Sequence, residues 1–207
     1  GKRVYEFAGR IFEVYSEMDN AVREMTGEIS GALTIGASTT IAEYMLPSLL
    51  GEFKQHYPDV NIHLKVSNTE GIVQMVENNI IDLGVVEAPV SNKNLVVDEC
   101  RTDELVAIVP NDHVLSSLDS IKIDELIQHP FICREEGSGT RDVIVECLAQ
   151  NGVDKKALKI SMELGSPEAI KGAVEAGMGI SIISSTTIDK EMRLKSLHPL
   201  HLEPPLT

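Results

Sequence analysis

Short apolar runs alternate along most of this chain with longer runs that carry apolar residues at helical spacing. The short runs predict strands at residues 33–36, 60–66, 82–86, 105–109, 131–133, 159–163 and 180–183. The longer runs predict helices at residues 40–56, 71–79, 123–128, 140–150 and 167–177. Strands that alternate with helices of this length indicate βαβ units and mainly parallel sheets. We therefore expect an α/β fold.

The N-terminal segment has a different pattern. Its apolar residues alternate spacings of four and three, as in a heptad repeat, at Val4, Ala8, Ile11, Tyr15, Met18, Val22 and Met25. A narrow seam of this kind favours pairing with another helix, so residues 1–27 are predicted to form a dimerisation or connector helix that ends at Thr26–Gly27. The alternative is a helix that packs on its own domain.

One stretch of the chain suggests two lobes. Residues 95–110 are long for a single strand and contain a polar interruption at 100–104, so the chain is expected to leave one sheet there and enter another. The return is expected near residues 194–202. This assigns residues 31–103 and 199–207 to lobe I and residues 104–198 to lobe II, with a small polar ligand in a cleft between them.

Polar turns link strands to helices at three places in the sequence. Ser38, Thr39 and Thr40 follow the first strand, the glycine-rich turn 135–141 follows the strand at 131–133, and Ser166 precedes Pro167. The N-terminus of a helix presents free N–H groups and favours negative charge, so the three turns together indicate a small-anion site. Each turn taken alone is also explained by simple helix capping.

Composition limits the class of partner. The chain of 207 residues is 43% hydrophobic, and 18 basic against 32 acidic residues give a net charge of −14. A charge of this sign repels nucleic acid, so any anion must be recognised locally. The odd number of cysteines, Cys100, Cys133 and Cys147, fits a reducing cytosol, and neither a signal peptide nor a membrane span is apparent. We expect this sequence to be an excerpt from a longer polypeptide.

The sequence offers little support for catalysis or for a bound cofactor. The run 137–141 lacks the Lys-Ser/Thr pair of a nucleotide-binding loop, and 176–179 holds only a fragment of a dinucleotide motif. The six histidines are scattered and suggest no metal site, and no serine lies in a nucleophile-elbow pattern. We therefore predict no enzyme activity, no cofactor and no metal.

Several motifs recur in the order and spacing of a known family. They are Gly31-Ala-Leu-Thr-Ile-Gly-Ala-Ser38, Leu46-Pro47, Phe53, Tyr57-Pro58, Asp82-Leu-Gly84, Val109-Pro-Asn-Asp-His113 and Glu175-Ala-Gly-Met-Gly-Ile-Ser181. With the heptad helix, they resemble the effector-binding domain of LysR-type transcriptional regulators with part of its linker helix. The resemblance implies two Rossmann-like lobes of the type II periplasmic-binding-protein kind. It also implies a winged helix-turn-helix ahead of residue 1 and a last helix and strand after Thr207, none of which this sequence contains.

The resemblance also implies a function and a site. A small metabolite in the inter-lobe cleft is expected to control how a homodimeric or homotetrameric cytoplasmic protein engages its promoter, with DNA bound only through the domain absent here. The turn 135–141 looks most like regulators of sulfur assimilation and of carbon fixation, whose effectors are sulfur oxyanions, sulfur metabolites or phosphorylated compounds. Matching positions give the effector-binding residues as Ser38, Thr39, Thr40, Ser67, Asn68, Thr69, Ser138, Gly139, Thr140, Arg141 and Ser166. For Arg141, solvent exposure or pairing with Glu135 or Glu136 is an equal alternative.

Two other classes of protein remain open at this point. An exported or cytosolic solute-binding receptor for a small oxyanion shares the lobes and the turns, but it has no use for a heptad helix. An enzyme on the same two-lobed fold is the other alternative, and it is expected to show turnover or a covalent cofactor.

Overall fold

The structure is a computed structural model that describes residues 29–206 and, in the N-terminal segment, Arg3, Phe7, Ala8, Arg10, Ile11, Val14, Tyr15 and Met18. Its contacts divide the chain into two compact units. One comprises Gly1–Leu33 with Ser48–His63, and the other comprises Thr34–Pro47 with Leu64–Thr207. These units do not coincide with the expected lobes, so the lobe boundaries stay a prediction.

The first sheet has the strand order β2-β1-β3, with β1 at Gly31–Ser38, β2 at Val60–Ser67 and β3 at Leu83–Val85. Strands β1 and β3 are parallel, and Ile35 lies opposite Leu83. The chain leaves β1 through a π-helical turn, η1 at Ile41–Met45, and continues into α2 at Leu46–His56. Helix α3 at Thr69–Glu77 follows β2 and packs beside β3. A βαβ arrangement of this kind brings the carboxyl ends of β1 and β3 to the same edge of the sheet.

The second sheet has the strand order β5-β9-β4-β8. Its strands are β4 at Leu105–Pro110, β5 at Ser120–Lys122, β8 at Ser181–Ser184 and β9 at Leu197–Leu206. A two-stranded parallel sheet of β6 at Pro130–Arg134 and β7 at Lys159–Leu164 joins it through a bridge between Phe131 and Ile180. Strand β4 runs antiparallel to both β8 and β9, so the expectation of mainly parallel pairing is wrong for this sheet.

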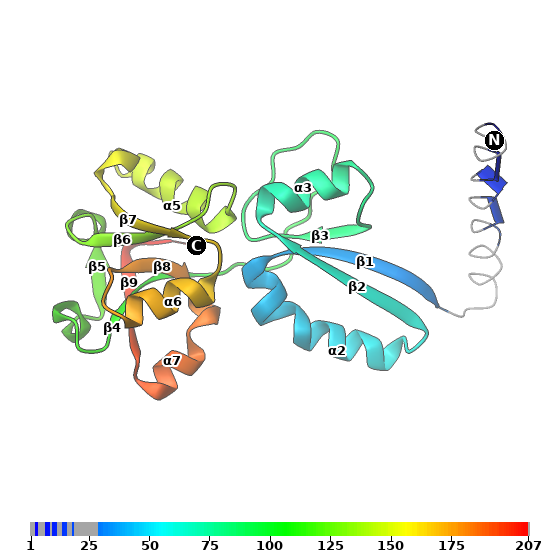
Figure 1. Ribbon diagram of the computed structural model, residues 1–207. Coiled ribbons are helices and arrows are strands. Elements are labelled where there is room, and N and C mark those ends of the chain that lie inside the picture. Colours follow the sequence, from blue (N-terminus) through cyan, green and yellow to red (C-terminus); the bar gives the residue numbers. More distant parts are fainter. Residues whose placement is uncertain are drawn as a thin grey trace. The chain divides into compact units, whose positions relative to one another are not determined.

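All six residues of β4 are buried, because helices cover both faces of the strand. Leu105, Ala107 and Val109 join the core on one side with α4 at Ile123–Leu126 and α5 at Gly139–Gln150. Val106 and Ile108 join the core on the other side with α6 at Pro167–Glu175. Figure 1 shows α5 and α6 on opposite sides of β6 and β8. The period of two along β4 thus builds a three-layer α/β/α arrangement.

The C-terminal strand belongs to the second sheet. Residues 197–206, most of which were expected in lobe I, form β9, which pairs with β4 on one side and with β5 on the other. The physical reason is burial, because Leu197, Leu200 and Leu202 are all at most 2% exposed within the cores of the second sheet. The short strand β5 and the helix α7 at Asp189–Leu194 were also absent from the sequence prediction.

The expected heptad seam is only partly covered by the structure. Ala8, Ile11, Tyr15 and Met18 have helical backbone, while Val4, Val22 and Met25 lie outside the described residues. Ile11, Tyr15 and Met18 are 68%, 60% and 56% exposed. Exposed apolar side chains at this spacing are typical of a helix that pairs with another helix. Within the described part of the chain, no helix is both long enough and apolar enough to cross a membrane.

Candidate functional site

The end of β1 contributes the first group of polar side chains. Ser38 is the last residue of the strand, and the backbone is already helical at Thr39 and Thr40. Ser38 and Thr40 are 2% and 4% exposed, and Thr39 is half-buried. The turn that follows is π-helical, a geometry that occurs frequently at functional sites. The sequence here therefore buries two hydroxyls at the carboxyl end of a parallel strand, where α/β proteins bind ligands.

The start of α3 contributes a second group. Asn68 caps the helix, because its side-chain oxygen accepts a hydrogen bond of 2.9 Å from the N–H of Gly71. Its amide nitrogen donates to the carbonyl of Glu136 at 3.0 Å, so both ends of the amide have protein partners. Thr69 follows as a buried residue, and Ser67 is half-buried beside Gly71. Asn68 thus ties α3 to the turn before α5, while Thr69 supplies a hydroxyl.

The start of α5 contributes a third group. Ser138 and Thr140 are 1% and 3% exposed, and Ser138 occupies the N-cap position without making a side-chain capping bond. Gly139 lies so close to its neighbours that a Cβ atom there would be 2.8 Å from both the Ala88 Cβ and the Thr69 Oγ1. Only glycine permits this approach, which brings the starts of α3 and α5 together beside the segment after β3.

Three of these hydroxyls share an unusual property. Among the described residues, no group lies in hydrogen-bonding geometry with Ser38 Oγ, Thr69 Oγ1 or Ser138 Oγ, although all three atoms are buried. A buried polar group without a partner costs about 1–3 kcal/mol, and native proteins rarely keep one without a functional reason. Each hydroxyl stands at or just before the start of a helix, where the backbone also favours negative charge. The arrangement fits a small anion with several oxygens.

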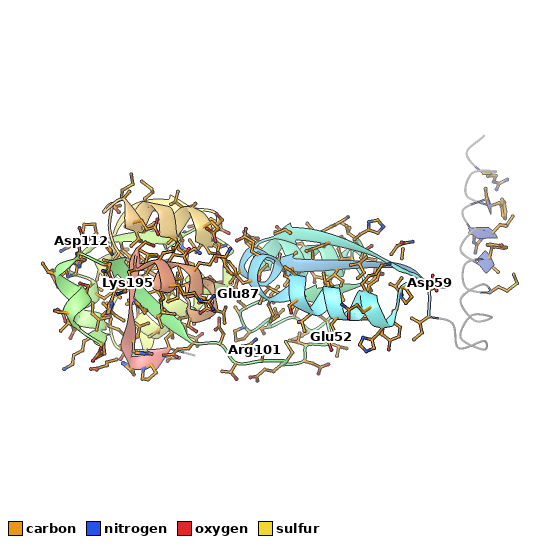
Figure 2. All side chains as sticks on the ribbon, turned by 90° about the horizontal axis from the view of Figure 1, so that it is seen from below. Glu52, Asp59, Glu87, Arg101, Asp112 and Lys195 are labelled. Atoms are coloured by element: carbon orange, nitrogen blue, oxygen red, sulfur yellow. The ribbon has the colours of Figure 1, made fainter. Side chains whose placement is uncertain are left out.

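Two charged residues of this region were missed by the sequence analysis. Arg134 ends β6, is 3% exposed and forms a two-point ion pair with Glu135 at 2.8 and 3.0 Å. Glu87 follows β3, and Thr140 Oγ1 donates to its carboxyl at 3.4 Å. Figure 2 labels Glu87 beside the helical segment that follows β1. Arg134 is the last residue of its strand and Glu87 lies two residues after β3, so the rule that ligands bind at the carboxyl ends of strands could have found them.

The ionisation of Glu87 reflects competing influences. Burial raises the pKa of this carboxyl, and the nearby Asp103 adds to the rise. The Thr40 hydroxyl and the positive charge of Arg134 lower the pKa, but they do not outweigh burial. The carboxyl of Glu87 therefore lies beside the hydroxyls of Thr40 and Thr140.

Arg141 forms ion pairs with acidic side chains in this structure. Its guanidinium donates to Glu163 at 2.5 Å and to Glu136 at 3.5 Å, and also to the carbonyl of Arg134 at 3.0 Å. Of the two alternatives left open by the sequence, the structure shows the pairing with Glu136. Arg134 is a buried cation of this region, at 3% exposed.

Ser166 caps its helix, because its hydroxyl accepts a 3.2 Å hydrogen bond from the N–H of Ala169. Helix α6 also meets the π-helical turn, since the Tyr44 hydroxyl donates to Glu168 and the Lys171 ammonium lies 5.1 Å from the centre of the Tyr44 ring. Burial, and then the hydrogen bond to the Glu168 carboxylate, raise the pKa of Tyr44 to about 12. Tyr44 and Lys171 thus tie α6 to the segment that follows Ser38 and Thr40.

The structure brings several of the predicted residues together. Gly139 approaches Thr69 and Ala88, and Glu87 lies beside Thr140 and Thr40. The residues gathered in this way are Ser38, Thr40, Thr69, Ser138, Gly139 and Thr140. Asn68, Arg141 and Ser166 lie at the same helix starts, but their side chains have protein partners. Among the residues that the structure describes, no group of three histidine, cysteine, aspartate or glutamate side chains is placed to hold a metal ion.

Two α/β sheets, with helix N-termini that gather buried hydroxyls, define a domain of the class that binds small polar ligands. The chain belongs to the LysR family of regulators: the model of the LysR substrate binding domain matches residues 26–207. The resemblance seen in the sequence is thereby confirmed. The fold is the two-lobed, periplasmic-binding-protein-like fold of LysR effector-binding domains.

Relatives and solved structures agree with this assignment. A probable RuBisCO transcriptional regulator of Gracilaria tenuistipitata var. liui is 38% identical over 206 residues, which are 98% of this chain and 67% of that protein. Its counterpart in Cyanidium caldarium is 35% identical over 98% of this chain and 65% of that protein, so the chain spans about two thirds of these relatives. The regulatory domain of CcmR from Synechocystis PCC6803, solved with 2-PG, is 36% identical, with a TM-score of 0.75 over 86% of this chain and 83% of that one. The effector-binding domain of QuiR, solved with shikimate, shares the fold with a TM-score of 0.71 over 84% of this chain and 81% of that one, at 22% identity.

Proposed function

We propose that this chain is the effector-sensing domain of a transcriptional regulator and that its effector is a small anion bound by Ser38, Thr69 and Ser138. The observation that carries the proposal is the set of three buried hydroxyls without hydrogen-bond partners among the described residues. Thr40, Thr140 and the backbone at Gly139 complete the donor set. An anion that accepts hydrogen bonds from these groups removes the desolvation cost that they carry in its absence.

The effector class that this donor set fits best is a phosphorylated or sulfur-containing oxyanion. A tetrahedral oxyanion presents several acceptor oxygens, and the buried Arg134 supplies positive charge close to Glu87. The CcmR domain, solved with 2-phosphoglycolate, is 36% identical to this chain, which supports a phosphorylated carboxylate over a bare inorganic ion. A phosphorylated carboxylate has a second charged end, which we expect to increase its affinity over that of an inorganic ion.

The remaining parts of the function follow from the same proposal. The effector acts by changing the relative stability of two conformations of a cytoplasmic homo-oligomer, and a separate basic domain engages the promoter. The charge of −14 supports this division, because a domain with such a charge is a poor ligand for DNA. Sensing rather than catalysis is proposed, since the relatives are named as transcriptional regulators.

Isothermal titration calorimetry with 2-phosphoglycolate, sulfate and glycolate tests the proposal. We expect saturable binding of 2-phosphoglycolate, competition by sulfate, and much weaker binding of glycolate, which lacks the phosphate. The double variant Ser38→Ala/Thr40→Ala should lose affinity, because each hydrogen bond to a charged ligand contributes roughly 1.5–3 kcal/mol. Ser117→Ala is the matched control, since this exposed hydroxyl donates only to the nearby carbonyl of Val114. Equal affinity of the double variant and the parent would contradict the proposed site.

A further inference from the structure

Glu87 places a carboxyl where the proposed site receives an anion. It lies two residues after the end of β3, and the Thr140 hydroxyl donates to it at 3.4 Å. The hydroxyl of Thr40 also acts on it, so two donors of the proposed site, Thr40 and Thr140, face this carboxyl. The neighbouring residue, Ala88, lies close against Gly139, so the segment that carries Glu87 packs against the start of α5.

This placement creates a conflict between two negative charges. A carboxylate and an oxyanion that share one set of hydroxyl donors lie within a few ångströms of each other and repel each other in this half-buried site. Arg134 is the cation that faces Glu87, and its own two-point ion pair with Glu135 already uses part of its charge. Asp103 also acts on Glu87, and because it is acidic it adds to the repulsion.

Protonation of Glu87 resolves the conflict. A neutral carboxyl no longer repels the anion, and its O–H becomes a further hydrogen-bond donor. Burial already raises the pKa of Glu87, so less free energy is needed to protonate this carboxyl than an exposed one. The proton comes from the solvent or buffer and is released again when the anion leaves.

We propose that Glu87 is the specificity-determining residue of the site: its carboxyl takes up one proton when a fully charged anion binds, and then donates a hydrogen bond to that anion. The inference rests on the proposed function and goes beyond it, because it couples effector binding to pH. It also implies that charged Glu87 repels any anion whose binding is too weak to offset the free energy of protonating this carboxyl.

The sign of the pH dependence follows from linkage. Binding of an anion raises the pKa of Glu87 above its value in the free protein, so affinity is greatest below the lower of these two pKa values. As pH rises between the two values, affinity falls by a factor of about ten per pH unit, because one pKa unit corresponds to a tenfold change. Above the higher value, the affinity no longer changes through this group.

Calorimetric titration of the whole chain and of the variant Glu87→Gln tests the inference. Glutamine resembles the neutral carboxyl and cannot titrate. The probes are sulfate, which stays fully charged across the neutral range, and 2-phosphoglycolate. Each titration is run in buffers of different ionisation enthalpy, so that the proton uptake per bound ligand is measured directly. Glu136→Gln is the matched control, because it removes the same charge from a side chain that is 87% exposed.

We expect Glu87→Gln to bind sulfate about tenfold more tightly than the parent above neutral pH, without proton uptake and with a flat pH profile. Tighter binding by the variant alone, with no detectable binding by the parent, supports the inference equally. Parent and variant with the same affinity and the same proton uptake would overturn the inference and leave the proposed function intact. Loss of binding in Glu87→Gln at every pH would also overturn it, because Glu87 is then an acceptor for a ligand proton. No binding of either probe to either protein would overturn the proposed function itself.

Discussion

Ser138 and Ser166 occupy the same N-cap position at the start of two helices, but replacing them by alanine should have opposite effects on stability and on ligand affinity. Ser166 caps α6 through a 3.2 Å hydrogen bond from the N–H of Ala169, whereas Ser138 at the start of α5 makes no side-chain capping bond. Ser138 is also 1% exposed, and its hydroxyl has no hydrogen-bond partner among the described residues. Replacement of each serine by alanine should therefore separate a capping role from a ligand-binding role.

The magnitudes follow from these environments. Ser166→Ala removes a working cap and should destabilise the protein by about 0.5–2 kcal/mol. Ser138→Ala removes a buried hydroxyl whose desolvation costs about 1–3 kcal/mol, so the ligand-free protein should be as stable as the parent or more stable by up to that amount. For a chain of this size, each kcal/mol shifts the melting temperature by about 2–4 °C. Affinity for 2-phosphoglycolate should fall by roughly 1.5–3 kcal/mol in Ser138→Ala and change little in Ser166→Ala.

Thermal and urea unfolding followed by circular dichroism measure the stabilities, and calorimetric titration measures the affinities. We expect Ser138→Ala to keep its stability and lose affinity for the ligand, and Ser166→Ala to lose stability and keep its affinity. A Ser138→Ala protein that is destabilised as much as Ser166→Ala would refute the reasoning, because the hydroxyl then has a structural partner. An unchanged affinity in Ser138→Ala would remove this residue from the proposed site.

Three further predictions concern other parts of the chain. Glutamate at Ile11 and Met18 should weaken self-association in sedimentation experiments, because charge at a heptad seam opposes helix pairing; a parent that is monomeric at high concentration would contradict this. The chain should show no appreciable affinity for promoter DNA in fluorescence anisotropy at low salt, because its charge of −14 opposes binding, and tight sequence-specific binding would refute the division of labour proposed above. Lys171→Met should destabilise the protein by about 3–5 kcal/mol in urea unfolding, since it leaves the half-buried Glu191, now 2.8 Å from the ammonium, without its partner. Burial lowers the pKa of Lys171, but its bonds to Glu191, Tyr44 and Glu168 raise it overall, so this loss should be the same across about pH 6–9 and should diminish in strong alkali.

The sequence by itself determined most of the local structure. Strands were expected at 60–66, 105–109 and 159–163 and are found at Val60–Ser67, Leu105–Pro110 and Lys159–Leu164. The helix expected at 140–150 is found at Gly139–Gln150. These elements depend on periodicity, caps and turn residues that lie within one segment, so a single sequence carries the information. The same local signals indicated the three polar turns at helix starts and, with the order of the motifs, the LysR family.

Only the tertiary structure decided which partners these elements have. The pairing of β9 with β4 and β5, and the antiparallel direction of β4 against β8, depend on which apolar faces are buried together across long separations in sequence. The same holds for the candidate site. The sequence gives Ser138 and Ser166 the same capping signal, and only their surroundings separate a hydroxyl without a partner from a hydroxyl that caps a helix. Glu87 likewise becomes significant only where Thr140 meets it and Gly139 approaches the neighbouring Ala88, because burial and the approach of distant charges are properties of the folded chain and not of the local sequence.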